Sequence, residues 1–578
     1  MTRRCLRPLL IAVLLGQLTL SLTGCTDRKT DPVRSGWSRG LPVATTNLRD
    51  APAAAWTSAG RWVAWTSTAG DRARLTLTRV SPGGDVVVVP LDLGQESARA
   101  PRLVAAPDGL ILFFLGSAAT GRGTLLVQRL SHDGIPVGPS ARLGQQGEGV
   151  SAYCVASADR TTLVAWASRE SGVRITALGE DPAVADPGRP VAQSGDSPTL
   201  AVDEEGAAHL AWIYEPALGR REVLYARISS DLSQIEGPWV LGVATGGLGA
   251  IFSPPILLLD ADWIYAFLTI EYRSGPKAGT TETYAFAAPR QNPELVRPFV
   301  VALPDLTPEG HACCLEGAPF GSVSTALAGN TSVRTLGGDP KARQHAVLLA
   351  SAKLPVGRRV EFQPVLVFLH GGEVSGWSPI ASTPDSAIAG VVIQSPEGWH
   401  AVWLDMRATN EYRVLYATTA PSEARRINRF DASDLAYVVV TILSGLLAGL
   451  AAIPLFLLAA IPGLLLTAGH YVFGGEGDLR SFTGKLLLGL SASVYSMTKL
   501  MFTAGMVPSL PFAIWLPPAL ARLLATAAPI LFLAGGVGAV AVYWRRSDQP
   551  GLLPAYGLFV GTDLILSLLL VGPALAGA

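Results

Sequence analysis

Carboxylates, arginines and tyrosines recur in polar loops that follow apolar segments of this 578-residue sequence. Four of these loops read SRES, YEP, EYRSGPK and DMR. If the fold brings them together, such side chains can hold a glycan or a peptide, or supply the acid/base pair of a glycosidase. The alternative is that surface loops are polar in any protein. The candidate ligand-binding residues, none of which is assigned a catalytic role, are Arg169, Glu170, Tyr214, Glu215, Glu271, Tyr272, Arg273, Asp405 and Arg407.

Other chemical signatures are sparse. The sequence contains no G-x-S-x-G, Walker or zinc signature, so neither a metal nor a cofactor is predicted. The segment HACC ends in Cys313 and Cys314, and adjacent cysteines are poor ligands for one ion; plain thiols or a strained vicinal disulfide are the alternatives. Together with Cys154 they are too few for a disulfide framework. His209 and His400 fall inside apolar alternations, where we expect packed rather than catalytic histidines.

The N-terminal segment MTRRCLRPLLIAVLLGQLTLSLTGC is typical of an export signal. A basic start precedes an apolar stretch over residues 9–22 that is too short to span a bilayer comfortably. Its ending, LTGC, resembles a bacterial lipobox, and this resemblance implies removal of residues 1–24 and lipidation of Cys25. An ordinary signal peptide with a chance cysteine, or an uncleaved anchor, remains an alternative. Residues 25–40 are polar and predict a tether.

A repeated phrase indicates how the loops are positioned. DEEGAAHLAWIY, ending at Tyr214, and SPEGWHAVWLD, ending at Asp405, both run from an acidic turn through small and apolar residues to a tryptophan. Further apolar alternations follow each copy, so each unit predicts about four short strands. Such a sheet, repeated about every 45 to 55 residues, buries its faces by radial stacking as a blade of a β-propeller. The closing aromatic anchors are Trp65, Phe114, Trp166, Trp212, Phe267 and Trp403.

The blade count and the ring closure follow from the ends of this series. We expect seven blades, or six if the irregular segment 320–382 is an insertion. The last unit supplies only three strands, and GLPVATTNLRDAP near residue 41 resembles the fourth-strand segment GRPVAQSGDSP. The N-terminal strand should therefore complete the last blade, which leaves no sheet edge open.

The run over residues 198–212, P-x-L-A-V-D-x-x-G-x-x-H-x-x-W, resembles bacterial propellers of the sialidase-like superfamily. The resemblance extends over residues 41–425 and implies the propeller fold. It also implies that ligands bind on the face that carries the loops between second and third strands. The Asp-boxes, arginine motif and Tyr/Glu pair of true sialidases are not intact, so the resemblance transfers no catalytic residue.

The composition changes abruptly at residue 436. Apolar stretches cover 436–473, 486–506, 523–543 and 552–575, which predicts an all-α bundle of about four transmembrane helices, or five if the first stretch is a hairpin. Lys499 and Asp563 fall within these stretches, and we expect them to meet near mid-membrane. The role of this pair is either that of a structural ion pair or that of a proton or ion relay.

The net charge and the mean hydropathy of the chain limit the classes of function. With 45 basic and 45 acidic residues the chain has no net charge, so nucleic acid is not an expected partner. Only 16% of residues are charged and the mean hydropathy is +0.35, which favours membrane lipid as a partner. The expected organisation is a signal at 1–24, a tether at 25–40, an extracytoplasmic propeller at 41–425, a linker at 426–435 and a membrane domain at 436–578.

These observations predict a lipid-anchored, multi-pass protein of a bacterial cell membrane. Its propeller would bind a glycan, peptide or protein ligand without catalysis. The alternatives are a cell-surface glycoside hydrolase or lyase of sialidase-like fold, and a sensor or transporter accessory subunit. Two carboxyls about 5 to 10 Å apart would favour the hydrolase.

Overall fold

The computed structural model describes residues 36–578, except for 58–59, 118–122, 159–160, 179–186, 248, 304–331, 342, 357–358, 431, 451–452, 474–476, 504–517 and 577–578. Cys25, Cys313 and Cys314 therefore lie outside the described residues. The described chain divides after Arg429 into two compact units, a propeller and a helical unit.

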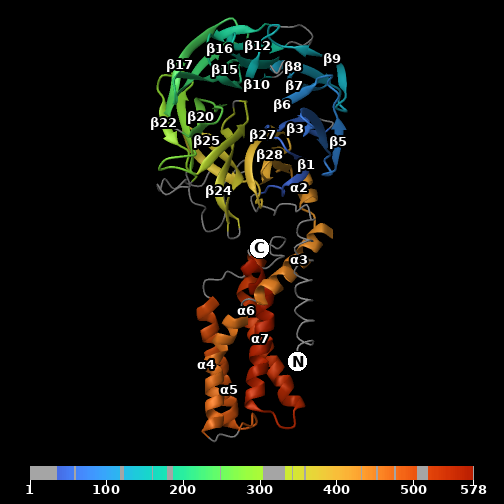
Figure 1. Cartoon of the computed structure of the whole chain (residues 1–578), viewed down its shortest axis with the longest axis vertical. Helices are drawn as coiled ribbons and strands as arrows, with labels where there is room; N and C mark the ends of the chain where they lie inside the picture. The colour runs from blue at the N-terminus through green and yellow to red at the C-terminus, as the bar shows by residue number, and fades with distance from the viewer. Residues whose placement is uncertain are drawn as a thin grey trace. The chain divides into compact units, whose positions relative to one another are not determined.

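Seven antiparallel sheets form the propeller (Figure 1), which confirms the seven-bladed fold. The first strands of neighbouring blades contact one another and make the inner ring. Blades 1 to 4 contain β2 (Ala53–Thr57), β3 (Gly60–Ala69), β4 (Arg72–Val80), β5 (Val86–Pro90); β6 (Ser97–Ala106), β7 (Gly109–Ser117), β8 (Gly123–Leu130), β9 (Pro136–Arg142); β10 (Val150–Ala158), β11 (Thr161–Ser168), β12 (Gly172–Leu178), β13 (Arg189–Ala192); and β14 (Asp196–Val202), β15 (Ala208–Ala217), β16 (Arg220–Ile228), β17 (Ile235–Thr245). Blades 5 to 7 contain β18 (Ala250–Phe252), β19 (Ile256–Leu259), β20 (Trp263–Tyr272), β21 (Thr281–Pro289), β22 (Arg297–Val300); β23 (Val333–Gly338), β24 (Ala346–Val356), β25 (Arg359–His370), β26 (Glu373–Pro379); and β27 (Ser386–Ser395), β28 (Gly398–Ala408), β29 (Glu411–Thr418).

The ring is closed by the first described strand. β1 (Leu41–Thr46) pairs antiparallel with β29 and completes blade 7 in the order β27-β28-β29-β1, as predicted. A second contact joins the same two parts of the chain. The buried Arg39 donates hydrogen bonds to the carbonyls of Ile427 and Arg429, both at 2.7 Å. These carbonyls lie at the C-terminal end of helix α2 (Pro421–Ile427), where a cation is favourable. The two ends of the propeller chain therefore hold each other.

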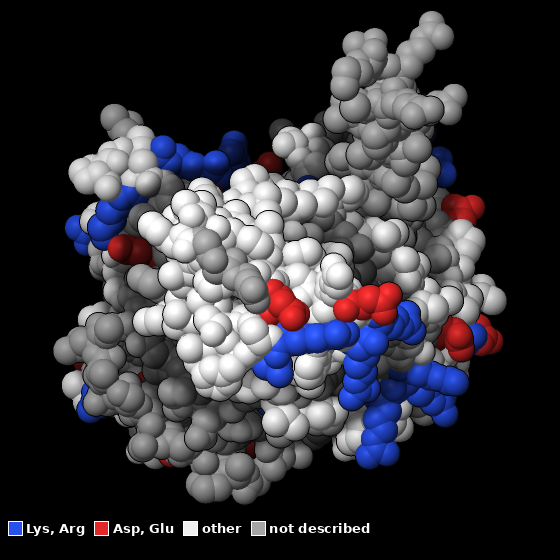
Figure 2. Space-filling model, turned by 90° about the horizontal axis from the view of Figure 1, so that it is seen from below, with Lys and Arg blue, Asp and Glu red and all other residues white. Residues whose placement is uncertain are grey.

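The helical unit differs from the expected membrane domain. It contains α3 (Ala432–Leu450), α4 (Ile453–Val472), α5 (Phe482–Thr503), α6 (Pro518–Arg546) and α7 (Leu552–Ala576). Among the described residues, none of these helices combines the length and the apolar character that a crossing of the membrane requires. The prediction of a transmembrane bundle is therefore wrong. One end of this unit carries a group of Lys and Arg side chains (Figure 2).

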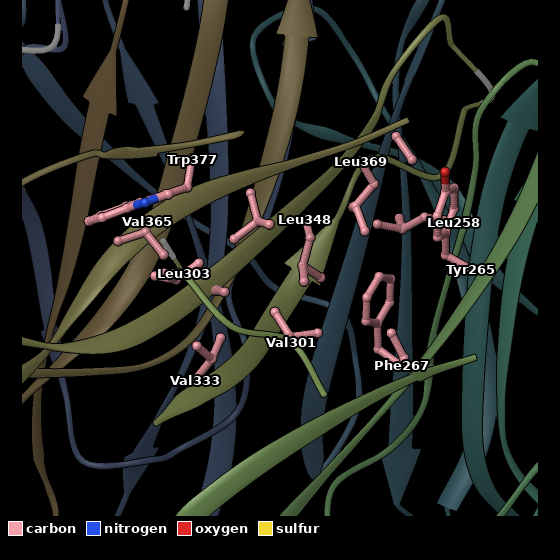
Figure 3. Close-up of a cluster of buried hydrophobic side chains, with 14 of the residues drawn as sticks. Leu258, Tyr265, Phe267, Val301, Leu303, Val333, Leu348, Val365, Leu369 and Trp377 are labelled. Atoms are coloured by element: carbon pink, nitrogen blue, oxygen red, sulfur yellow. The ribbon is translucent and has the colours of Figure 1, made fainter. Parts of the chain in front are cut away.

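Aromatic and aliphatic side chains fill the spaces between blades. Trp166, Trp212 and Trp403 are fully buried, as are Phe114 and Phe267, so five of the predicted anchors are core residues. The sixth predicted anchor, Trp65, is only half-buried, and it donates a hydrogen bond to Thr78 Oγ1 at 3.0 Å. Trp62 is the fully buried tryptophan of that strand. Figure 3 shows one inter-blade core, in which blade 5 residues meet blade 6 residues: Leu258, Tyr265, Phe267, Leu348, Val365, Leu369 and Trp377.

Candidate functional site

All nine predicted ligand residues lie toward one face of the propeller. We call it the rim face; it is defined by the turns between second and third strands, at residues 70–71, 169–171, 218–219, 273–280 and 409–410. The structure distributes the nine over four blades. Arg169 and Glu170 belong to blade 3, Tyr214 and Glu215 to blade 4, Glu271, Tyr272 and Arg273 to blade 5, and Asp405 and Arg407 to blade 7.

Several of these residues have local partners. Glu170 accepts a hydrogen bond from Ser168 at 2.7 Å, and Glu215 pairs with Arg221 at 3.5 Å. Arg407 pairs with Glu411 at 3.2 Å. Each of these three contacts lies within a single blade. A common ligand site that joins these blades stays a prediction.

A second set of contacts does form a site, between blades 5 and 6. Glu271 Oε1 lies 2.9 Å from Arg273, and its Oε2 lies 3.5 Å from Arg334 of the inner strand β23. The Arg334 side chain is only 13% exposed, and its guanidinium lies 4.9 Å from the centre of the Phe362 ring. Strand β20, the loop that follows it and strand β23 thus place two guanidinium groups against one carboxylate.

The electrostatics of this site come from an excess of positive charge. Burial lowers the pKa of Arg334, and Glu271 opposes that effect. The positive charges of Arg49 and Arg273 are close enough to lower this pKa further. Arg49 lies in the connection between β1 and β2, so the last and first blades also contribute. We call Arg49, Arg273 and Arg334 the arginine cluster.

Such a cluster has a defined chemistry. Guanidinium groups bind carboxylate, sulfate or phosphate through paired, charge-assisted hydrogen bonds. One carboxylate, Glu271, does not balance three cations held close together. Phe362 adds a ring face, over which Lys353 lies at 5.4 Å from the ring centre. The arrangement suits an anionic ligand that also carries apolar or hydroxyl-bearing surface.

A group of carboxyls lies at the rim end of blade 7. A single nitrogen of Arg413, Nη2, lies 2.6 Å from Asp385 and 2.8 Å from Asp405. Asp405 is fully buried and also accepts a hydrogen bond from Thr383 at 2.9 Å, so this predicted ligand residue is internal. Burial raises the pKa of Asp405 to about 6, although Arg413 opposes the shift.

Asp385 is the accessible member of this group, with 22% of its side chain exposed. Burial raises its pKa, and the neighbouring charge of Glu361 from blade 6 raises it further, against the opposing effects of Arg413 and Arg407. Glu361 accepts a hydrogen bond from Ser386 at 2.8 Å. Two carboxyls from adjacent blades, one of them with a raised pKa, have the residue types of an acid/base pair.

The loop pattern alone missed Arg49, Arg334, Glu361 and Asp385. Arg334 lies inside a strand, VRTLGG, where a single charge among small and apolar residues was the available signal. Asp385 lies in a short connection between blades, which the analysis of turns between second and third strands did not consider.

The predicted packed histidines lie at the opposite ends of the strands. Asp203 accepts backbone hydrogen bonds from the turn that it begins, and its other oxygen lies 3.1 Å from His209 Nε2. His209 Nδ1 lies 2.7 Å from the Tyr225 hydroxyl. In blade 7, His400 lies between Ser395 and Tyr416 in the same way, at 2.9 and 2.8 Å.

Both histidines are buried, as predicted, and burial lowers the pKa of each, to about 3 for His400 with a contribution from Arg61. They are therefore neutral connectors between a turn and a tyrosine. The repeated phrase of the sequence encodes this device together with the aromatic core residue that follows it.

The helical unit holds the other predicted pair. Lys499 Nζ lies 2.6 Å from Asp563 Oδ2 and 2.7 Å from Ser567. The Tyr495 hydroxyl donates to the same aspartate oxygen at 2.7 Å. Asp563 is fully buried, and its second oxygen has no hydrogen-bond partner among the described residues. The contact between α5 and α7 is thus present, whereas the membrane setting expected for it falls with the transmembrane bundle.

No family model and no curated protein sequence matches the chain. Solved structures with a similar fold include a thermostable family-43 glycoside hydrolase, 11% identical over 67% of this chain and 92% of that one, with a TM-score of 0.30. A Dyadobacter fermentans protein of unknown function is 7% identical over 68% and 98%, with a TM-score of 0.35.

The sialidase of Trypanosoma rangeli is also similar in fold, at 9% identity over 68% of this chain and 56% of that one, with a TM-score of 0.31. At such identities and TM-scores these likenesses determine nothing about the activity of this chain. The function has to be argued from its own residues.

Proposed function

We propose that the propeller binds an anionic glycan on the rim face, at the arginine cluster. The observation that carries this proposal is that Arg334, nearly buried, shares the single carboxylate of Glu271 with Arg273 while Arg49 adds a third positive charge. An acidic sugar supplies the missing anion. Its hydroxyls match a neighbouring network in which Tyr272 and Tyr284 both donate to Glu282, at 3.3 and 2.9 Å.

A glycan array probed with the full chain tests the proposal. We expect binding to uronate, sialylated or sulfated glycans and none to their neutral counterparts. Arg334→Gln should weaken this binding at least about tenfold, because it removes a paired contact to the anion. Arg189→Gln, which removes an exposed arginine elsewhere on the propeller, should leave it unchanged. Equal binding of neutral and acidic glycans would reject the arginine cluster as the site.

Hydrolysis of the bound glycan is a second candidate, favoured by the raised pKa of Asp385 beside Glu361. In this scheme Asp385 donates a proton to the leaving oxygen, and Glu361 acts as base or nucleophile. Asp385→Asn should abolish hydrolysis of an alkyl glycoside of the acidic sugar identified on the array, whose leaving oxygen needs a proton, while binding on the array persists. Failure of the unmodified chain to hydrolyse that glycoside would reject this candidate and leave the binding proposal standing.

Attachment at the N-terminus is a separate proposal that rests on the LTGC sequence. We infer lipidation of Cys25, which would display the propeller outside the bacterial cell membrane. Metabolic labelling with a palmitate analogue should mark the full chain and not Cys25→Ala. Equal labelling of both would reject the lipobox.

A further inference from the structure

Two turns of the helical unit are fixed to each other at one end. The turn from α4 to α5 and the turn from α6 to α7 exchange backbone hydrogen bonds. The amide of Leu479 donates to Pro550 at 2.9 Å, and the amide of Leu552 donates to Gly477 at 2.8 Å. Four helix ends are thereby held together, so their side chains form one continuous surface.

This surface is basic. Arg480, Lys485, Arg545 and Arg546 are all exposed, and Figure 2 shows Lys and Arg side chains gathered there beside acidic side chains. Among the residues that the structure describes, none of the four forms an ion pair. We call these four residues the basic end.

The helix dipole favours the position of only two of the four cations of the basic end. Arg545 and Arg546 lie in the last turn of α6, where cations are favourable. Arg480 and Lys485 flank the start of α5, whose first turn contains no acidic residue. The positive end of the helix dipole disfavours cations at that position. An anion from outside the chain would offset this repulsion.

The same end exposes large apolar side chains. Phe473 is 91% exposed and Phe482 is 80% exposed, and Val472 beside them is 80% exposed. Trp544 is also exposed, and Lys485 Nζ lies 5.0 Å from the centre of its ring. Cations interleaved with exposed aromatic side chains are the combination that proteins use at the surface of an anionic membrane.

We propose that the basic end docks on a lipid surface with anionic headgroups. The four cations contact the headgroup phosphates, while Phe473 and Phe482 enter the interface beside them. Because the attraction depends on charge, it should require anionic lipid and weaken as salt is raised. The proposal concerns this end of the helical unit alone and is independent of the ligand of the propeller.

Flotation of the full chain with vesicles tests the proposal. One vesicle is phosphatidylcholine alone, and the other contains about 30% phosphatidylglycerol. We expect binding to the second to exceed binding to the first, and to fall when NaCl is raised from about 0.1 to 0.5 M. The variant R480Q/K485Q/R545Q/R546Q should bind the anionic vesicle at least about tenfold less, since each cation near such a surface contributes about 1 kcal/mol.

A matched control removes the same amount of charge from the propeller surface, in R72Q/R74Q/R142Q/R189Q, and should bind the anionic vesicle like the unmodified chain. Circular dichroism at 222 nm establishes that both variants keep their helices. Equal binding to both vesicles overturns the proposal, as does full binding by the variant of the basic end. Binding to an anionic polymer such as heparin, without binding to anionic vesicles, would also overturn it and indicate a polyanion instead.

Discussion

The propeller and the helical unit use apolar residues in opposite ways. In the propeller, large apolar side chains are enclosed between blades, and exposed ones such as Val88, Val137 and Val240 lie on the outer strands. In the helical unit, exposed large apolar side chains recur along the helices: Leu458, Leu465, Leu486, Leu490, Ile530, Val537, Leu553 and Ile565. An exposed apolar surface of this extent marks a region that interacts with something else. The propeller encloses its own core, whereas the helical unit leaves many large apolar side chains exposed.

The two units also differ in the partners of a buried aspartate. In the propeller, Asp405 has Arg413 and Thr383 as partners for its two oxygens. In the helical unit, Asp563 receives Lys499 and Tyr495 on one oxygen, and the other oxygen has no partner among the described residues. Each aspartate thus has two such partners, but among the described residues only Asp405 has a partner on each of its oxygens.

The largest expected effect is loss of ring closure. Deletion of residues 41–47 removes β1, leaves the edge of β29 unpaired and exposes the core around Val43. We expect the melting temperature of the propeller to fall by at least about 10 °C, since an effect of 1 kcal/mol moves it by a few degrees. Tryptophan fluorescence measures this change, because all tryptophans except Trp515 and Trp544 belong to the propeller.

The exposed Thr45→Ala in the same strand is the control and should change stability by less than about 0.5 kcal/mol. Helix content at 222 nm should be retained in the deletion if the two units are independent. A deletion that melts within a degree or two of the unmodified chain would show that β1 does not close the ring.

The next effect concerns the pair in the helical unit. Lys499→Met or Asp563→Leu alone leaves the other charge unpaired in a buried position, at a cost of about 3 to 5 kcal/mol. The double variant should lose less than either single variant, because no orphan charge remains. Urea unfolding followed at 222 nm measures all three. Lys485→Met, at an exposed lysine of the same helix, is the control, and additive losses in the double variant would mean that the pair is not coupled.

A smaller effect follows from the raised pKa of Asp405. Its pKa is about 6 in the folded propeller, against 3.8 for the free group. The folded chain therefore binds more protons than the unfolded chain, so protonation of Asp405 raises the free energy of unfolding at low pH. This stabilisation is lost as pH rises from about 4 through about 6. The loss should amount to about 2 to 3 kcal/mol. Urea unfolding of the propeller from pH 4 to 7 should show this slope in the unmodified chain and in Asp71→Asn, and not in Asp405→Asn.

The sequence predicted the propeller well because its folding rules are local and repeated. Alternation, turn residues and the repeated phrase each act within one blade, and the N-terminal strand resembles the fourth strands closely enough to predict the closure. The arginine cluster depends instead on how blades 5 and 6 meet the connection between β1 and β2. A register shift between Thr335 and Gly337 adjusts β23 just beyond Arg334, and no local pattern encodes that geometry.

The helical unit was mispredicted for a related reason. Hydropathy counts apolar residues along the chain, and it left open whether 436–473 forms one helix or a hairpin. The structure divides that stretch between α3, which ends at Leu450, and α4, which begins at Ile453. Where helices begin and end is decided by packing against other helices, as for Tyr495 of α5, which meets Asp563 of α7. Composition carries no information about those contacts.

The smallest expected effect tests whether the repeated phrase has one meaning. His209→Gln and His400→Gln each remove one of two buried hydrogen bonds, because glutamine reaches either the turn or the tyrosine but not both. The expected loss is about 1 kcal/mol in each case. Similar losses from blades 4 and 7, measured by urea unfolding, would show that both copies are structural connectors. Glycan binding should be unaffected, since these histidines lie at the strand ends away from the rim face. Loss of glycan binding in His209→Gln with unchanged stability would instead place Asp203, His209 and Tyr225 in the ligand site. The ligand would then bind on the face opposite the rim face.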